Sequence, residues 1–200
     1  VTVAADDDIT DLSSLENWHV VKGEPLLAAN PANEADKTVK ITENAEAYTA
    51  LQCLGSKEEI TAELYMDKKS AGSIYLADKN GNALLTLKVG KLAASANPGG
   101  ENNTVAGFEY PSKKWFALSF RVDLKKRSYD IYVDGKKQNN APVQFDFSKT
   151  ASDNGEISRM GFECEDGGFF VNDVDNKALS FDEGLEIRKI IYSDAGGNTY

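Results

Sequence analysis

Short stretches of alternating apolar and polar residues, separated by glycine turns, run through most of this chain and restrict what it can fold into. The clearest stretches are 60–66 (ITAELYM), 118–123 (LSFRVD) and 129–133 (YDIYV). Alternation with a period of two places successive side chains on opposite faces of a strand, whereas a helix needs a period of about 3.6. The turn pairs Asn-Gly at 80–81 and Asp-Gly at 134–135 suit tight hairpins. We therefore expect antiparallel sheets.

The same criteria predict nine strands along the chain. They cover residues 39–41, 48–54, 59–66, 73–78, 83–89, 115–123, 129–133, 157–163 and 185–192. Helical spacing occurs over residues 8–18, where we expect a short helix or 3₁₀ turn. Nine strands without a repeated strand–helix unit predict an all-β antiparallel β-sandwich. No linker or internal repeat divides the sequence, so residues 1–200 are expected to form a single domain.

The composition argues against several classes of protein. The formal net charge is −10, whereas nucleic-acid binders carry a basic surface. No apolar run approaches the roughly 20 residues of a membrane helix, so we expect no membrane span. The first residues do not form a signal peptide, and a start at Val1 leads us to expect a piece of a longer protein. One His and two Cys argue against most zinc sites and against a disulfide framework, while leaving open whether Cys53 and Cys164 pair or remain free thiols.

Alternation also predicts which side chains face outward from the strands. The inward positions are apolar, and the outward positions include tyrosines, carboxylates and an arginine. These outward residues are Glu63, Tyr65, Tyr75, Arg121, Asp130 and Tyr132. Aromatic rings stack on the apolar faces of sugars, and Arg, Asp and Glu hydrogen-bond sugar hydroxyls. The six residues are therefore a candidate sugar-binding set, although tyrosine is also favoured in any half-exposed strand.

Candidate catalytic residues are fewer. Glu163 and Glu165 share a strand face and could form a glycosidase pair, but they run into an Asp-Gly-Gly turn and equally fit a solvated strand end. A lyase base could be His19, the sole histidine, or Tyr132 with Arg121 binding a uronate. Residues 51–140 hold 14 basic and 10 acidic residues, which would suit a uronate-containing polysaccharide or simply reflect solvating lysines at loop tips.

Several segments resemble one superfamily. The run 115–123 followed by YDIYVDGK at 129–136 resembles a hairpin of the concanavalin A-like lectin and glucanase superfamily, in its laminin-G-like and carbohydrate-binding-module forms. The segment 184–193 is similar to the last strand of these domains, and Asn17-Trp18 with its following glycine turn is similar to their opening. The resemblance implies a jelly roll of two curved sheets, one of them concave. The superfamily contains lectins, carbohydrate-binding modules, glycoside hydrolases, polysaccharide lyases and protein-binding domains, so the fold alone does not select a function.

The resemblance also implies a structural calcium ion, because many members hold one where the two ends of the jelly roll meet. Acidic residues occur near both ends of this chain, and we expect Asp6, Asp8 and Asp182 to be the ligands. A solvated acidic tail would explain the same residues.

Together these observations favour a non-catalytic carbohydrate-binding module. We expect it to bind a plant or microbial polysaccharide or oligosaccharide on the concave sheet face. We also expect it to be secreted or displayed on a bacterial cell surface, linked to other domains of a polysaccharide-degrading enzyme. The alternatives are a jelly-roll polysaccharide lyase or glycoside hydrolase, and a laminin-G-like module that binds protein.

Overall fold

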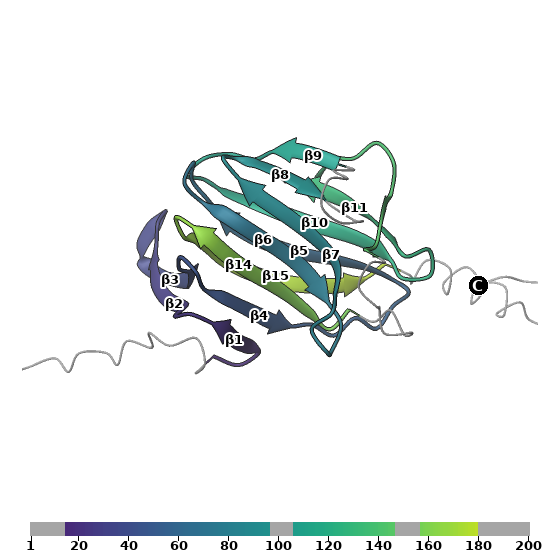
Figure 1. Cartoon of the computed structure of the whole chain (residues 1–200), viewed down its shortest axis with the longest axis horizontal. Helices are drawn as coiled ribbons and strands as arrows, with labels where there is room; N and C mark the ends of the chain where they lie inside the picture. Colours follow the sequence, from purple (N-terminus) through teal and green to yellow (C-terminus); the bar gives the residue numbers. More distant parts are fainter. Residues whose placement is uncertain (1–14, 97–105, 147–156, 180–200) are drawn as a thin grey trace, which may run out of the picture.

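The alternating segments pair into two antiparallel sheets that pack face to face (Figure 1). The computed structural model describes residues 15–96, 106–146 and 157–179. These residues form fifteen strands and no helix. The predicted all-β antiparallel sandwich is therefore confirmed. No helix in the described ranges is long and apolar enough to cross a membrane.

The seven-stranded sheet, which we call sheet A, contains the first strand and a four-strand meander. Its order is β1 (Trp18–Lys22), β4 (Glu46–Ala50), β14 (Arg159–Asp166), β6 (Ala71–Ala77), β7 (Ala83–Gly90), β8 (Ala93–Ala96) and β9 (Ala106–Glu109). Neighbouring strands are antiparallel throughout, and β14 joins the β1–β4 pair to the meander.

The eight-stranded sheet, which we call sheet B, is built around β5. Its order is β12 (Lys136–Lys137), β11 (Ser128–Val133), β10 (Trp115–Asp123), β5 (Lys57–Tyr65), β15 (Phe169–Ala178), β3 (Asn33–Ile41) and β2 (Leu26–Asn30), and β13 (Val143–Gln144) also pairs with β11. The chain crosses from sheet B to sheet A between β5 and β6.

The core lies between the sheets and consists of the inward side chains that alternation predicts. All of them are at most 9% exposed: Ile60, Ala62, Leu64, Met66, Ile74, Leu76, Leu85, Leu87, Val89, Leu118, Phe120, Val122, Tyr129, Ile131 and Val133. Phe162 of sheet A contacts Phe169 of sheet B, with ring centroids 6.5 Å apart. Trp18 covers Phe162 from the edge strand β1. Each inward residue thus helps to join the two layers.

Some predicted elements differ from the structure. Trp18, expected at the end of a helix, begins β1, because its backbone pairs with β4 while its ring packs against the core. The remainder of that segment up to residue 14, and the predicted strand 185–192, lie outside the described residues. The sequence does not predict β15, because only Val174 and Ala178 are apolar after Val171 and they do not alternate regularly with the polar residues.

Candidate ligand-binding face

The six predicted sugar-binding residues are divided between the two outer faces of the sandwich. Glu63 and Tyr65 lie on β5, Arg121 on β10, and Asp130 and Tyr132 on β11, so these five share the outer face of sheet B. Tyr75 lies on β6 and therefore on sheet A. The six do not form one row, because alternation shows which side of a strand faces outward but not which sheet the strand joins.

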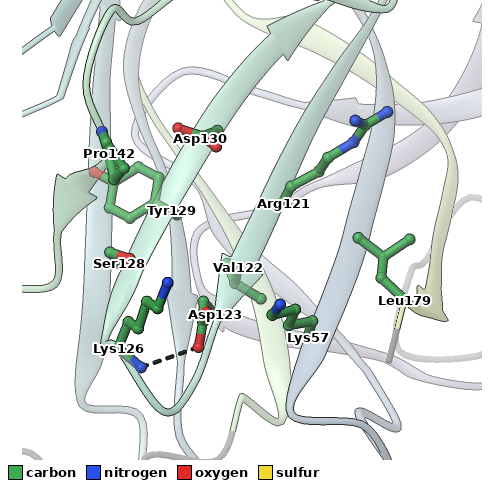
Figure 2. Close-up of a pocket in the computed structure, with 10 residues that line it drawn as sticks. All are labelled: Lys57, Arg121, Val122, Asp123, Lys126, Ser128, Tyr129, Asp130, Pro142 and Leu179. Carbon is green, nitrogen blue, oxygen red and sulfur yellow. Dashed lines mark hydrogen bonds between the residues drawn. The ribbon is translucent and has the colours of Figure 1, made fainter. Parts of the chain in front are cut away.

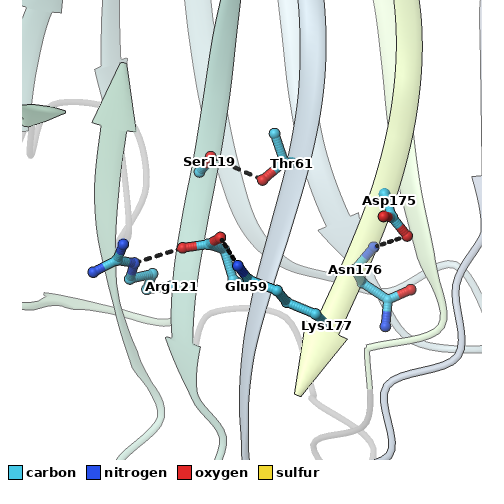
Figure 3. Close-up of polar contacts among 7 residues, drawn as sticks. All are labelled: Glu59, Thr61, Ser119, Arg121, Asp175, Asn176 and Lys177. Carbon is cyan, nitrogen blue, oxygen red and sulfur yellow. Dashed lines mark hydrogen bonds and ion pairs between the residues drawn. The ribbon is translucent and has the colours of Figure 1, made fainter. Parts of the chain in front are cut away.

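On sheet B, the strand register aligns four alternating charges, those of Asp130, Arg121, Glu59 and Lys177, on β11, β10, β5 and β15. Arg121 Nε donates to Glu59 Oε2 at 2.6 Å, and Lys177 Nζ lies 3.2 Å from Glu59 Oε1 (Figure 3). Burial alone would raise the pKa of Glu59, but hydrogen bonds from Arg121 and Lys177 lower it overall. The Arg121 guanidinium also stacks on the ring of Tyr132, 4.2 Å from the ring centroid. Much of the bonding capacity of Arg121 is thus used within the protein.

The remaining predicted residues of sheet B also contact protein groups. Asp130 accepts a hydrogen bond from Asn139 and lies 3.4 Å from Lys137 Nζ. Tyr65 lies between Trp115 and Phe170, with ring centroids 5.7 and 5.9 Å away. Burial and the adjacent carboxylate of Asp173 raise the pKa of Glu63.

Two hollows lie on the sheet B side. One, of about 260 Å³, is lined mainly by residues of the β10–β11 hairpin, among them Arg121, Lys126 and Asp130. Lys57 of β5 also lines it (Figure 2). In this hollow Asp123 accepts a hydrogen bond from the backbone N–H of Lys126, which closes the hairpin turn. The other, of about 150 Å³, lies beside Glu59, Thr61 and Asn176 (Figure 3). At these hollows Glu59, Arg121, Thr61 and Asp130 have hydrogen-bond partners within the protein.

On sheet A, an aromatic row crosses the outer face. The strand register aligns His19, Tyr48, Gly161, Tyr75 and Thr86 on β1, β4, β14, β6 and β7. The His19 and Tyr48 rings stack with centroids 4.9 Å apart. The Arg159 guanidinium lies 4.1 Å from the Tyr48 centroid. Tyr48, Gly161 and Arg159 were not among the predicted site residues, because their alignment depends on β14 pairing with β4.

The ring of Tyr75 fills the space above Gly161. A Cβ atom at position 161 would lie 2.0 Å from Tyr75 Cζ, so the ring can lie there only because residue 161 has no side chain. Burial is the main cause that raises the pKa of Tyr75 to about 12, and the nearby carboxylate of Glu46 adds to it. Tyr75 therefore presents a neutral, half-buried ring on the sheet surface.

A larger hollow opens around Tyr75. Its volume is about 360 Å³, and its lining combines aromatic, basic and acidic groups. The lining residues are Val21, Glu46, Ser73, Tyr75, Gly81, Ala83, Thr86, Arg159 and Glu163.

Two carboxyl groups of this hollow lie side by side. Glu46 and Glu163 are direct cross-strand neighbours on β4 and β14, and their carboxyl groups share a hydrogen bond. Lys22 Nζ donates to Glu163 Oε1 at 2.9 Å, which is the main cause of a lowered pKa at Glu163. Burial, with a further contribution from Glu163, raises the pKa of Glu46. Of the two, Glu46 therefore retains its proton to higher pH than Glu163 does.

This pair differs from the one considered from the sequence. Glu165 is exposed and lies at a bulge in the pairing of β14 with β6, while Glu163 contacts Glu46 and Lys22 instead. His19 is stacked on Tyr48 at the edge of the aromatic row.

The predicted calcium ligands Asp6, Asp8 and Asp182 lie outside the described residues, so the calcium site remains a prediction. Within the described ranges, no group of three or more His, Cys, Asp or Glu residues could hold a metal ion. Cys53 and Cys164 are both free thiols.

No family model and no curated protein matches the chain. Among solved structures, a sialidase superposes with a TM-score of 0.61 and 13% identity over 92% of this chain, which spans only 19% of the sialidase. A GH131 β-glucanase catalytic domain from Podospora anserina gives 0.52 and 12% identity, covering 83% of this chain and 86% of that domain. The binding domain of botulinum neurotoxin DC, solved with rat synaptotagmin II, gives 0.51 and 13% identity over 91% of this chain and 49% of that chain.

At such low identity these similarities concern the fold. The chain has a concanavalin A-like jelly-roll fold, as its sequence resemblance predicted. The same fold carries a sialidase, a glucanase and a neurotoxin binding domain, so the function has to be inferred from the surface.

Proposed function

We propose that this protein is a non-catalytic carbohydrate-binding module whose ligand, a polysaccharide or oligosaccharide, binds in the hollow on the outer face of sheet A. The observation that carries the proposal is the ring of Tyr75 above Gly161, surrounded by Arg159, Glu46 and Glu163. Sugars need an aromatic surface for their C–H faces together with donors and acceptors for their hydroxyls. Ligand sites are typically concave, with a few convergent polar groups.

Sheet A is favoured over sheet B because its hollow is larger and presents the half-buried ring of Tyr75, whereas polar groups on both faces have partners within the protein. On sheet B, Glu59 has two cationic partners and Asp130 has partners on its own hairpin. On sheet A, the carboxyl pair and Tyr75 line the largest of the three hollows described above. We therefore place the ligand at Tyr75, and not at Arg121 and Tyr132.

The carboxyl pair argues for binding rather than hydrolysis. In retaining glycosidases the two carboxyl groups lie about 5–5.5 Å apart, and in inverting enzymes they are further apart, with the scissile bond between them. Glu46 and Glu163 instead lie directly opposite each other on adjacent strands, with their carboxyl groups interacting with each other and not facing each other across a bound sugar. The pair can still bind hydroxyl groups that approach from the solvent side.

We propose further that the module belongs to a secreted or cell-surface bacterial protein and is joined to a polysaccharide-degrading enzyme. Linked binding raises the effective concentration of a catalytic domain at its substrate. A sialidase and a β-glucanase domain share the fold, which agrees with a sugar ligand without identifying it.

Affinity electrophoresis tests the proposal. The protein would be run through native gels containing xylan, glucans, mannan, pectins or alginate, with calcium or with EDTA. We expect at least one polymer to retard the chain, and Tyr75→Ala to abolish that retardation. Tyr132→Ala is the matched control, because it removes an outward-facing tyrosine from sheet B, where Arg121 stacks on its ring.

The outcomes separate the alternatives. Loss of retardation in Tyr132→Ala instead of Tyr75→Ala would move the site to sheet B. Release of soluble product from a polymer by the chain alone would make it a lyase or hydrolase. Absence of retardation by every polymer would reject sugar binding and favour a module that binds protein.

A further inference from the structure

The charged groups of the sheet A hollow are unevenly placed. The two carboxyl groups of Glu46 and Glu163 adjoin each other at one side of it, and exposed Glu165 follows on the same strand. The two nearest cations, Lys22 and Arg159, already have partners within the protein. Lys22 binds Glu163, and Arg159 stacks on Tyr48 and donates from Nη2 to the carbonyl oxygen of Lys79.

We propose that the hollow selects neutral sugar units, binding two adjacent hydroxyl groups through Glu46 and Glu163, and discriminates against uronates. This inference rests on the proposed function and specifies its ligand class. Adjacent hydroxyls of a neutral sugar are donors, and a carboxylate is an acceptor with two oxygens.

A uronate would bind less well, because its carboxylate is an acceptor with a negative charge of its own. Above the raised pKa of Glu46, where both side chains are ionised, its carboxylate would lose water beside two like charges, which repel it more strongly where solvent is partly excluded. The nearby cations would offset this cost only in part, because Lys22 would share its charge between the uronate and Glu163, and Arg159 already donates from Nη2 to the carbonyl oxygen of Lys79. Lys88 is exposed and lies two strands from Glu163, outside the lining of the hollow.

The surplus of basic residues between 51 and 140 does not alter this conclusion. Many of these residues belong to the sheet B side: Lys57, Arg121, Lys125, Lys126, Lys136 and Lys137 lie on β5, on β12 or on the β10–β11 hairpin. These six residues therefore offer their charge to the opposite face of the sandwich and not to the hollow on sheet A.

The test compares polymers that share a backbone and differ in charge. Suitable pairs are hydroxyethylcellulose with carboxymethylcellulose, highly methyl-esterified pectin with pectate, and mannan with mannuronan. Dissociation constants would come from gel mobility at several polymer concentrations, relative to mobility without polymer. For the backbone that binds, we expect the neutral member to bind about tenfold more tightly or better.

Charge-removing variants show whether the carboxyl pair causes the preference. The double variant Glu46→Gln, Glu163→Gln should bind the neutral polymer more weakly and bring the ratio of the two constants close to one. Glu59→Gln, which removes one charge from the opposite face, should leave the ratio unchanged.

Three results would overturn the inference. Equal or tighter binding of the anionic member would reject it while leaving sugar binding intact. A preference that survives in the double variant would assign it to other residues. Failure of every polymer to bind would overturn the proposed function, and this inference with it.

Discussion

Gly161 determines where the ring of Tyr75 can lie. Its importance comes from the space above it and not from its backbone conformation, since any side chain there would collide with the ring. Tyr75 was predicted to face outward from alternation alone, and it does so. The role of Gly161 could not be predicted, because it depends on the contact between β14 and β6.

Gly161→Ala should displace Tyr75 without removing an aromatic residue. The new Cβ would lie 2.0 Å from Cζ, and the far end of the tyrosine can move aside. We expect affinity for the retarding polymer to fall about tenfold. The phenol pKa of Tyr75, raised to about 12 mainly by burial, should also shift towards its ordinary value, which ultraviolet titration against the wild type would detect.

The matched control for this change is Gly90→Ala on β7. A Cβ at position 90 would lie 3.6 Å from the Cβ of Ala71, an ordinary contact on the same sheet. Unchanged affinity in Gly161→Ala would show that the position of the Tyr75 ring does not matter for binding.

At the scale of strands, pairing between β4 and β14 creates the carboxyl pair. Both strands present alternate residues outward, so either glutamate could be placed on a surface from the sequence. The contact between the two glutamates could not be predicted, because more than one hundred residues separate them along the chain. The same reason explains why Glu163 was considered with Glu165, its neighbour in sequence.

The pair should make stability depend on pH in a defined direction. Because the folded-state pKa of Glu46 is raised, its contribution is fully present at low pH and is lost as pH rises through that pKa. The free energy of unfolding of the wild type minus that of Glu46→Gln should therefore fall as pH rises from about 4 to 7. Urea unfolding at several pH values measures this difference.

Glu59→Gln provides a control of opposite sign. The folded-state pKa of Glu59 is lowered, so its contribution is present above the ordinary value and is lost as pH falls. The corresponding difference should grow with pH. A difference for Glu46→Gln that stays flat or grows would contradict the proton-retaining role of Glu46.

Glu58 holds the loop between β4 and β5 in place. It is 1% exposed, and its Oε1 accepts hydrogen bonds from the backbone N–H groups of Leu54 and Gly55, both at 2.8 Å. Glu58→Ala should lower the free energy of unfolding by about 2–3 kcal/mol, because it removes charge-assisted hydrogen bonds and leaves donors without a partner. Glu59→Ala, which breaks ion pairs at the surface, should cost roughly 1 kcal/mol or less. Similar losses for both variants in urea unfolding would contradict the structural role of Glu58.

For the whole molecule, the sequence predicted which residues are buried between the two sheets better than it predicted which exposed residues share an outer face. Inward positions such as Phe120 and Ile74 are buried as alternation required, and the β-sandwich follows from them. The assignment of each strand to a sheet could not be predicted, since β5 and β6 are adjacent in sequence yet lie in different layers. As a result, Tyr75 lies on sheet A, whereas the other five candidate residues lie on sheet B.

Burial should protect both thiols, since Cys164 lies in the core and Cys53 is partly buried against it. Burial, with a smaller contribution from Glu58, raises the pKa of Cys53 to about 12, and burial also raises the pKa of Cys164. With a thiol reagent such as DTNB at pH 8, we expect almost no reaction in the native protein and two thiols per chain in guanidinium without reductant. No reactive thiol after denaturation would indicate a disulfide between Cys53 and Cys164, contrary to the structure.

The central claim is that sugar binds on the outer face of sheet A. The most direct measurement is a ¹⁵N–¹H correlation titration with an oligosaccharide prepared from the polymer that retards the protein. We predict that chemical-shift changes concentrate at Tyr75, Gly161 and Glu163, while Arg121 and Tyr132 stay unperturbed. Changes centred on Arg121 and Tyr132, with sheet A unaffected, would contradict the claim.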